Sequence, residues 1–247
     1  MQANTASKDY TCPTSNPTIS TYYATPTVGS TWSAPSGTSP TYQITTYLSN
    51  YSSTNKAGGA LNTSSFLTIA AGGKSGCSGL KTPGGIGTYF AGAIYAAQSS
   101  LIAAQQANPG SLNAMIILSD GDASSSKVTS SPKANGTAYG SSIDQCQQAI
   151  DAANYAATNK TAVYSIAYGA PSSGCSTDTS GPLKGITACA TMRTMASTPG
   201  NFYSDATASQ NKGQCTSTAN PNLTLNNIFK QVATSFTVAR LIPDNAT

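Results

Sequence analysis

Carboxylates and hydroxyls, rather than imidazoles, are the groups with which this chain could do chemistry. Its 247 residues include eight acidic side chains and no histidine, and every acidic residue is an aspartate. This composition excludes Ser-His-Asp and Cys-His catalysis, zinc bound through histidine, and glutamate as a general base. The densest group is the turn Ser119-Asp120-Gly121-Asp122. We therefore expect a functional site at this acidic turn.

An apolar run leads directly into the acidic turn. Residues Met115 to Leu118 are large and apolar without polar alternation, which is typical of a strand buried on both faces of a parallel sheet. Open α/β sheets bind their ligands at the carboxyl ends of their strands. The acidic turn is therefore predicted to lie at the ligand-binding edge of such a sheet.

Apolar periodicity divides the rest of the chain into alternating helices and strands. Helices are expected over 88–107, 143–158, 187–197 and 225–236, and strands over 113–119, 162–168 and 201–204. Residues 41–48 could add an edge strand, and a short helical turn is possible near 64–70. The alternation predicts an α/β fold with a doubly wound, mostly parallel sheet and helices on both faces.

The six cysteines predict disulfides in an oxidising compartment. None forms a Cys-x-x-Cys pair and no histidine is present, so a zinc site is disfavoured. Six cysteines allow about 15 pairings. We favour Cys12–Cys77, Cys146–Cys215 and Cys175–Cys189. Only the last pair has a local argument, since it closes a short loop rich in Gly, Ser and Pro.

Charge and hydropathy exclude two classes of partner. The net charge of +4 comes without a basic cluster, so nucleic-acid binding is not expected. No apolar stretch is long enough to cross a membrane. The first ten residues also lack the apolar segment of an export signal, which is unexpected beside so many cysteines.

A family resemblance joins these features. Gly84-Gly85-Ile86-Gly87-Thr88, then a helix, then Met-Ile-Ile-Leu-Ser-Asp120-Gly121-Asp122 resembles the second half of a von Willebrand factor type A (VWA) domain. The likeness continues over about 84–243, and the Cys- and Tyr-rich style resembles bacterial TadG-like proteins of tight-adherence pilus systems. The resemblance implies a Rossmann-like sheet in 84–243, behind a loop-rich Cys-, Tyr- and Ser-containing segment over 1–83 and before a short tail over 244–247.

In that family, five side chains form a metal-ion-dependent adhesion site. Thr88 matches the family's loop threonine, and Asp120 matches the aspartate after the fourth strand, while Ser119, Gly121 and Asp122 would shape the rim. Mg²⁺, or Mn²⁺ or Ca²⁺ in its place, suits such oxygen ligands. A literal Asp-x-Ser-x-Ser also occurs at 122–126. We interpret it as a coincidence in a Ser-rich loop, because the threonine-bearing loop and helix precede this strand.

The family's first motif, Asp-x-Ser-x-Ser after an apolar strand, is missing before residue 84, where Asp9 is the only acid. We therefore expect a truncated domain that lacks its first strands, with Met1 an internal methionine or a mispredicted start. Two ligands do not make a cage, so metal binding should be weak or absent in this chain. Without its neighbour, strand 113–119 should become an apolar sheet edge that another chain can pair with.

The predicted function is protein binding rather than catalysis. The resemblance implies an adhesion-type VWA module, secreted or displayed on a cell surface, in a bacterial pilus-assembly or surface system. The alternative is a disulfide-stabilised structural or scaffold subunit of a surface assembly with no metal role.

Overall fold

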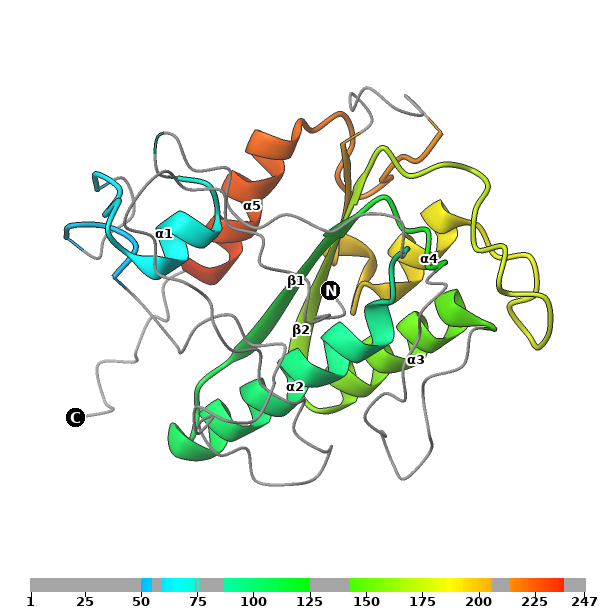
Figure 1. Cartoon of the computed structure of the whole chain (residues 1–247), viewed down its shortest axis with the longest axis horizontal. Coiled ribbons are helices and arrows are strands. Elements are labelled where there is room, and N and C mark those ends of the chain that lie inside the picture. Colours follow the sequence, from blue (N-terminus) through cyan, green and yellow to red (C-terminus); the bar gives the residue numbers. More distant parts are fainter. Residues whose placement is uncertain are drawn as a thin grey trace. The chain divides into compact units, whose positions relative to one another are not determined.

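The structure is a computed structural model that describes residues 50–54, 59–73, 75, 87–124, 143–205 and 214–237. The chain divides into two compact units, and Figure 1 draws the helices and strands of the chain. Of the described residues, those up to 111 and residue 124 belong to the first unit, and residues 112–123 and those from 143 onward belong to the second. The predicted boundary at 83–84, the predicted strand 41–48 and the tail 244–247 lie outside the described residues.

The first unit contains two helices. The short helix α1 spans Phe66–Ala70 and the long helix α2 spans Phe90–Ala107. An antiparallel bridge between Ser52 and Leu61 precedes α1. The helix predicted over 88–107 is confirmed, although it begins at Phe90 with Tyr89 at its N-cap. None of the helices that the structure describes is long and apolar enough to cross a membrane.

A small parallel sheet organises the second unit. Strands β1 (Asn113–Ser119), β2 (Thr161–Tyr168) and β3 (Phe202–Asp205) pair in the order β1-β2-β3. The connecting helices are α3 (Gln145–Thr158), α4 (Ala188–Met195) and α5 (Leu225–Thr237), with a 3-10 turn η1 over Pro199–Asn201. The predicted α/β alternation is thus confirmed as a mixed α/β unit around three parallel strands.

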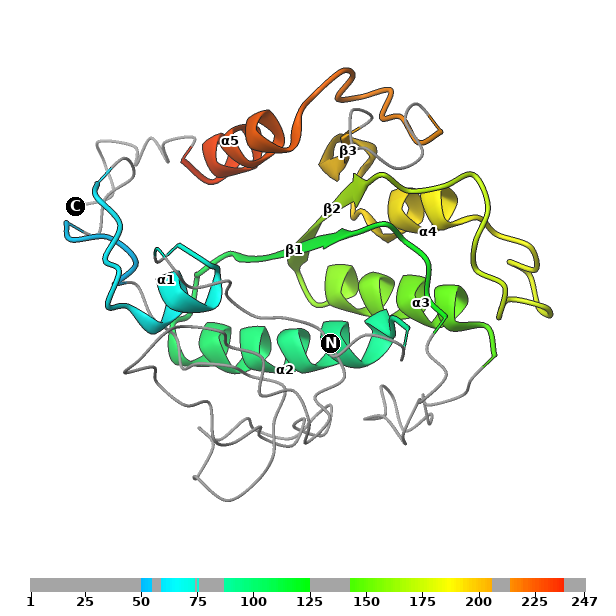
Figure 2. The ribbon, with the colours of Figure 1, turned by 45° about the horizontal axis from the view of Figure 1, so that its top comes forward.

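Helices cover both faces of this sheet within the second unit. Helices α3 and α4 lie on one face, and α5 lies on the other (Figure 2). The α3 side is close-packed through alanines, because Ala149, Ala152, Ala153 and Ala156 are fully or almost fully buried. Such small side chains let a helix approach a neighbouring element closely.

An apolar cluster holds α5 against the strands. Tyr164, Ile166 and Tyr203 of the sheet pack with Ile228 and Val232 of α5. Burial raises the pKa of the Tyr203 hydroxyl, and the nearby Tyr164 raises it further. This cluster centres on β2 and β3.

The prediction that Met115–Leu118 is buried on both faces was wrong. Met115 and Ile117 are buried, but Ile116 is 44% exposed and Leu118 is 45% exposed. The α5 cluster centres on β2 and β3 and is contacted by Ala114 of β1, which leaves Ile116 and Leu118 exposed on the same face. The fully buried central strand is β2, where residues 163–167 are all buried. Among the described strands β1 lies at an edge of the sheet, which agrees with the predicted apolar sheet edge at 113–119.

Candidate functional site

The acidic turn lies directly after the carboxyl end of β1, as predicted. Ser119 is the last residue of the strand and Asp120 is exposed. The Ser119 hydroxyl accepts from the backbone N–H of Gly121 at 3.3 Å, and Asp120 Oδ1 accepts from that of Asp122 at 3.3 Å. These bonds fold the backbone into a tight turn and leave the Asp120 carboxylate facing solvent.

Gly121 is the position at which this turn packs against α4. Its φ of +84° is in the left-handed region, which residues with a Cβ rarely adopt. A Cβ here would lie 2.5 Å from the carbonyl oxygen of Ala188 and 2.6 Å from Cγ of Met192. The glycine therefore supplies both a backbone conformation and a close approach to the first turn of α4.

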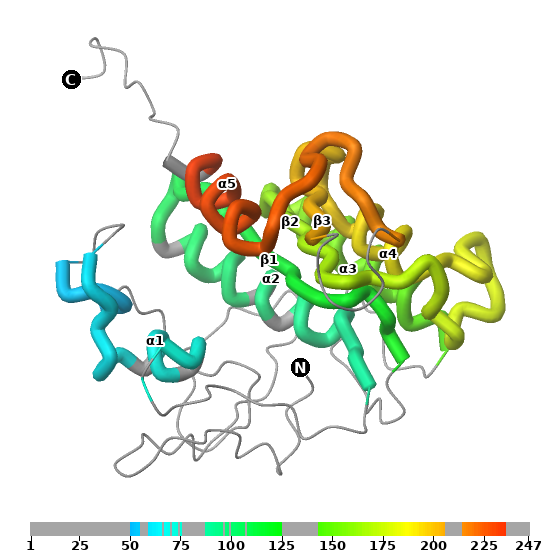
Figure 3. The backbone as a smooth tube through the Cα atoms, turned by 90° about the horizontal axis from the view of Figure 1, so that it is seen from above, coloured from blue at the N-terminus to red at the C-terminus, as the bar shows by residue number. Residues whose placement is uncertain are grey.

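The Asp122 carboxylate holds a distant loop in place. Its Oδ1 accepts from the backbone N–H of Cys175 at 2.8 Å. Cys175 belongs to the loop over 170–187 that joins β2 to α4 and extends beyond these elements (Figure 3). Asp122 thus positions this loop, and its predicted place at the rim of a metal site stays a prediction.

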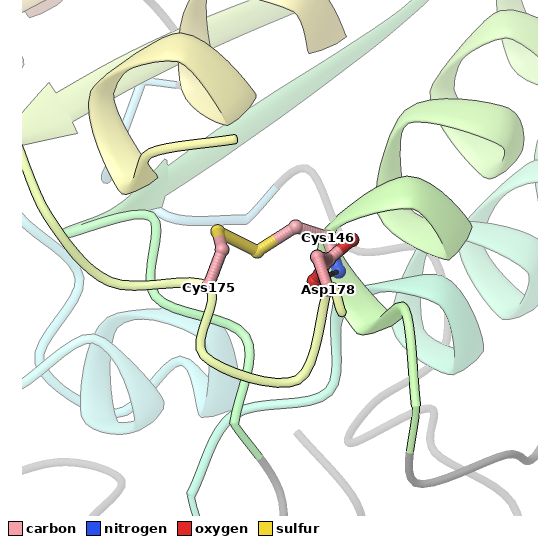
Figure 4. A group of neighbouring side chains, drawn as sticks. All are labelled: Cys146, Cys175 and Asp178. Atoms are coloured by element: carbon pink, nitrogen blue, oxygen red, sulfur yellow. Dashed lines mark hydrogen bonds between the residues drawn. A yellow bond between two sulfur atoms is a disulfide. The ribbon is translucent and has the colours of Figure 1, made fainter. Parts of the chain in front are cut away.

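A disulfide fixes the same loop to the first turn of α3. Cys146 and Cys175 are bonded with their Cα atoms 5.9 Å apart, and both sulfurs lie within 3.9 Å of the carbonyl oxygen of Gly121. Asp178 lies beside the pair (Figure 4). Sulfurs in a disulfide are not thiolates and do not ligate metal, so this group is a crosslink rather than a metal centre.

The favoured cysteine pairings were wrong where the structure tests them. The bonded pairs are Cys146–Cys175 and Cys189–Cys215, in place of Cys146–Cys215 and Cys175–Cys189. Loop-closure entropy alone favoured the shortest loop. The fold instead brings Cys175 to the acidic turn through Asp122 and leaves Cys189, in α4, beside the segment that follows β3. The predicted pair Cys12–Cys77 lies outside the described residues.

Asp178 caps the N-terminus of α3 although it lies more than 30 residues later in the chain. Its carboxylate accepts from the backbone N–H groups of Cys146 at 3.0 Å and Gln147 at 2.8 Å. These N–H groups have no partner within a helix. Asp144 precedes α3 with a φ of 52° and makes no side-chain cap, but its carboxylate accepts from the backbone N–H and hydroxyl of Ser180. Two aspartates therefore bind the loop to α3.

We expect Asp178→Ala to lower the free energy of unfolding by about 2 kcal/mol, because it leaves two N–H groups without their buried, charged acceptor. Asp151→Ala is the matched control, since Asp151 lies in α3 and, among the described residues, accepts from the Gln147 side chain and from no backbone N–H. It should cost less than about 1 kcal/mol. Urea unfolding followed by circular dichroism measures both. Equal losses would contradict a capping role for Asp178.

The two predicted metal ligands fall in different units. Thr88 is in the first unit, where its carbonyl accepts from the backbone N–H of Ser124 at 3.1 Å. Asp120 is in the second unit. In the described part of the second unit, Asp122 binds the distant Cys175 and Asp120 binds no distant segment. Asp120 is thus the one carboxylate of the acidic turn left for a metal ion. A single carboxylate does not provide the octahedral set of oxygen ligands that Mg²⁺ requires. A shared Thr88–Asp120 site stays a prediction.

The sequence analysis did not identify two aspartates that hold elements together near the carboxyl ends of the strands. Asp178 gives no local signal, because it caps a helix that begins 33 residues earlier along the chain, at Gln145. Asp205 ends β3, and its carboxylate accepts from the backbone N–H of Leu225 at the start of α5 at 2.7 Å. Its position directly after a predicted strand matches that of Asp120, so the strand-then-acid pattern could have identified it.

Comparisons with known proteins give little further information. No family model matches the chain, and no curated protein matches it. Among solved structures it is similar to the pilus adhesin SpaC from Lactobacillus rhamnosus GG, with 17% identity over 48% of this chain and a TM-score of 0.31. The match spans 17% of that protein's length. A likeness at this level supports no inference about fold or function.

Proposed function

We propose that this chain is a protein-binding module of an extracellular or cell-surface assembly, and that the carboxyl edge of its sheet contacts the partner. The observation that carries the proposal is the loop over 170–187. It is held at several points and presents an exposed tip that includes Pro182 and Lys184.

Four separate attachments hold this loop. They are the Cys146–Cys175 disulfide, the Asp122 carboxylate on Cys175, the Asp178 cap on α3, and the Asp144 carboxylate on Ser180. The start of α4 adds backbone bonds from Ala188 to Ser173 and from Cys189 to Pro171. A loop ordered before binding loses less conformational entropy on contact with a partner. Binding residues are commonly carried by loops on a rigid scaffold.

The proposed extracellular location is supported by the disulfides. Two disulfides in one small unit are consistent with an extracellular or cell-surface protein. The finer assignment, an adhesion-type VWA module of a pilus-assembly system, rests on the sequence resemblance alone. In it, Asp120 would be the exposed carboxylate that a divalent ion or a basic partner group reaches. The same disulfides also favour the second candidate, a structural or scaffold subunit with no metal role.

Matched lysine substitutions test the location of the contact. Lys184 at the loop tip and Lys230 on α5 are both exposed, so Lys184→Ser and Lys230→Ser remove the same charge at two places. The immobilised wild type and the variants are exposed to surface proteins of the source organism, and the captured proteins are quantified by mass spectrometry. A captured protein is then purified and titrated calorimetrically. We expect Lys184→Ser combined with Asp120→Ala to weaken binding at least about tenfold, because hot-spot contacts each contribute more than a kcal/mol.

Lys230→Ser should bind within about twofold of the wild type, as exposed groups away from a contact contribute little. The proposal would be contradicted, and the scaffold favoured, if the Lys184→Ser/Asp120→Ala variant bound as tightly as the wild type or if no protein were captured. A calorimetric titration with Mg²⁺ tests metal binding separately from partner binding. We expect no micromolar affinity for Mg²⁺. A micromolar affinity abolished by Asp120→Ala would show instead that the ion site is intact.

A further inference from the structure

Among the described strands, none pairs with the outer edge of β1. The strand hydrogen-bonds to β2 along one side, and along its other side the backbone groups from Ala114 to Ser119 have no hydrogen-bond partner in the part of the chain that the structure describes. Proteins usually protect such an edge with charges, prolines, bulges or a short strand. The seven residues of β1, Asn-Ala-Met-Ile-Ile-Leu-Ser, contain neither a charge nor a proline. This edge therefore lacks the features that prevent strand addition.

Exposed apolar side chains lie along the same strand. Ile116 is in register with Tyr164, and Leu118 is in register with Ile166, so both lie on the sheet face that α5 covers over β2 and β3. They remain 44% and 45% exposed, because the α5 cluster reaches β1 at Ala114 and does not include these two residues. A strand added to the edge would bury part of this apolar surface and satisfy the open backbone groups together.

The order of residues in β1 is self-complementary. In an antiparallel pair of two β1 strands centred on Ile116, each Ile116 faces the other. On the same face, the small Ala114 meets the large Leu118, and on the opposite face Met115 meets Ile117. The polar ends also meet, Asn113 against Ser119. Every pair is apolar with apolar or polar with polar, and like charges do not meet because β1 carries none.

We propose that β1 pairs antiparallel with β1 of a second copy of this chain, with the two-fold axis at Ile116, so that the two three-stranded sheets join. Such an interface uses the same patch on both copies and closes as a dimer. The opposite sheet edge is β3, which has only four residues and offers little to a further strand. The inference is independent of the proposed function, since it concerns the side of β1 rather than the carboxyl ends of the strands.

Sedimentation velocity across a concentration series tests the dimer. We expect a reversible monomer–dimer equilibrium for the wild type, and at least a tenfold weaker dimer for Ile116→Lys, which places two ammonium groups opposite each other. Ile143→Lys is the matched control, because Ile143 is 54% exposed and lies outside β1. It should dimerise within twofold of the wild type. Circular dichroism melting establishes that each variant is folded.

Cysteine crosslinking tests the register without disrupting the strand. Under mild oxidation Ile116→Cys should give a disulfide-linked dimer, since opposed residues approach within disulfide range. Ala114→Cys alone and Leu118→Cys alone should not, because each would be about 14 Å from its own copy. A mixture of these two variants should crosslink. Non-reducing electrophoresis and peptide mapping give the yield and the bonded pair.

Three results would overturn the inference. The first is a wild type that stays monomeric at every concentration, which would leave the edge open or covered by a segment of the same chain. The second is a dimer that Ile116→Lys leaves unchanged, which would place the interface elsewhere. The third is efficient crosslinking of Ala114→Cys alone, which would indicate a different register or an open assembly.

Discussion

Gly121→Ala should lower the free energy of unfolding by about 3 kcal/mol or more, because the substitution combines an unfavourable φ with a backbone collision. The added Cβ would lie 2.5 Å from the carbonyl oxygen of Ala188, which belongs to the first turn of α4. Either α4 must move or the acidic turn must open. Chemical unfolding followed by circular dichroism measures the loss.

Gly181→Ala separates the two causes of that loss. Gly181 also has a positive φ, of +71°, but a Cβ there would meet nothing within 4 Å. Its substitution should therefore cost only the conformational part, about 1 kcal/mol. If both variants lose the same stability, the packing of the acidic turn against α4 does not contribute and the described contact is not important for folding.

Removal of the Cys146–Cys175 disulfide by the double substitution Cys146→Ala/Cys175→Ala should cost about 3.5 kcal/mol in the chain-entropy model. The double substitution of Cys189 and Cys215 should cost nearly the same, since the sequence separations are 29 and 26 residues. The two variants should differ in which segment of the chain becomes less ordered. Of the two disulfides, Cys146–Cys175 is the one that holds the loop over 170–187 to α3.

Hydrogen exchange gives the measurement that distinguishes the two crosslinks. In the Cys146→Ala/Cys175→Ala protein, the amides of Asp178 and Gly185, which donate to Cys175 and Asp178 within the loop, should exchange much faster than in the wild type. In the protein without Cys189 and Cys215 they should stay protected. Equal protection in both variants would mean that the aspartates alone order the loop.

Local sequence patterns were enough to locate the elements. Strand 113–119 was predicted with the bounds that β1 has, and the helix predicted over 143–158 is α3 apart from its first two residues. Both depend on apolar spacing and on nearby turn residues, which act over a few positions. The acidic turn after β1 was found for the same reason, since it directly follows the strand.

Local sequence patterns could not identify which elements pack together or which cysteines are bonded. The apolar run Met115–Leu118 predicted two buried faces, yet Ile116 and Leu118 are exposed because the α5 cluster centres on β2 and β3. The disulfide pairs were also wrong, because a loop-length argument does not contain the position of Cys175 beside Asp122. In each case the deciding contact joins residues far apart in the chain.

The sequence by itself therefore determined that aspartates, serines and threonines would make the site, that the acidic turn follows a strand, and that cysteines would crosslink the chain. Only the tertiary structure decided what each aspartate does. Asp120 stays exposed, Asp122 holds Cys175, and Asp178 caps α3. The physical reason is that a carboxylate's role is set by the N–H groups around it. Those N–H groups come from segments 31 to 53 residues away, which only the fold brings together.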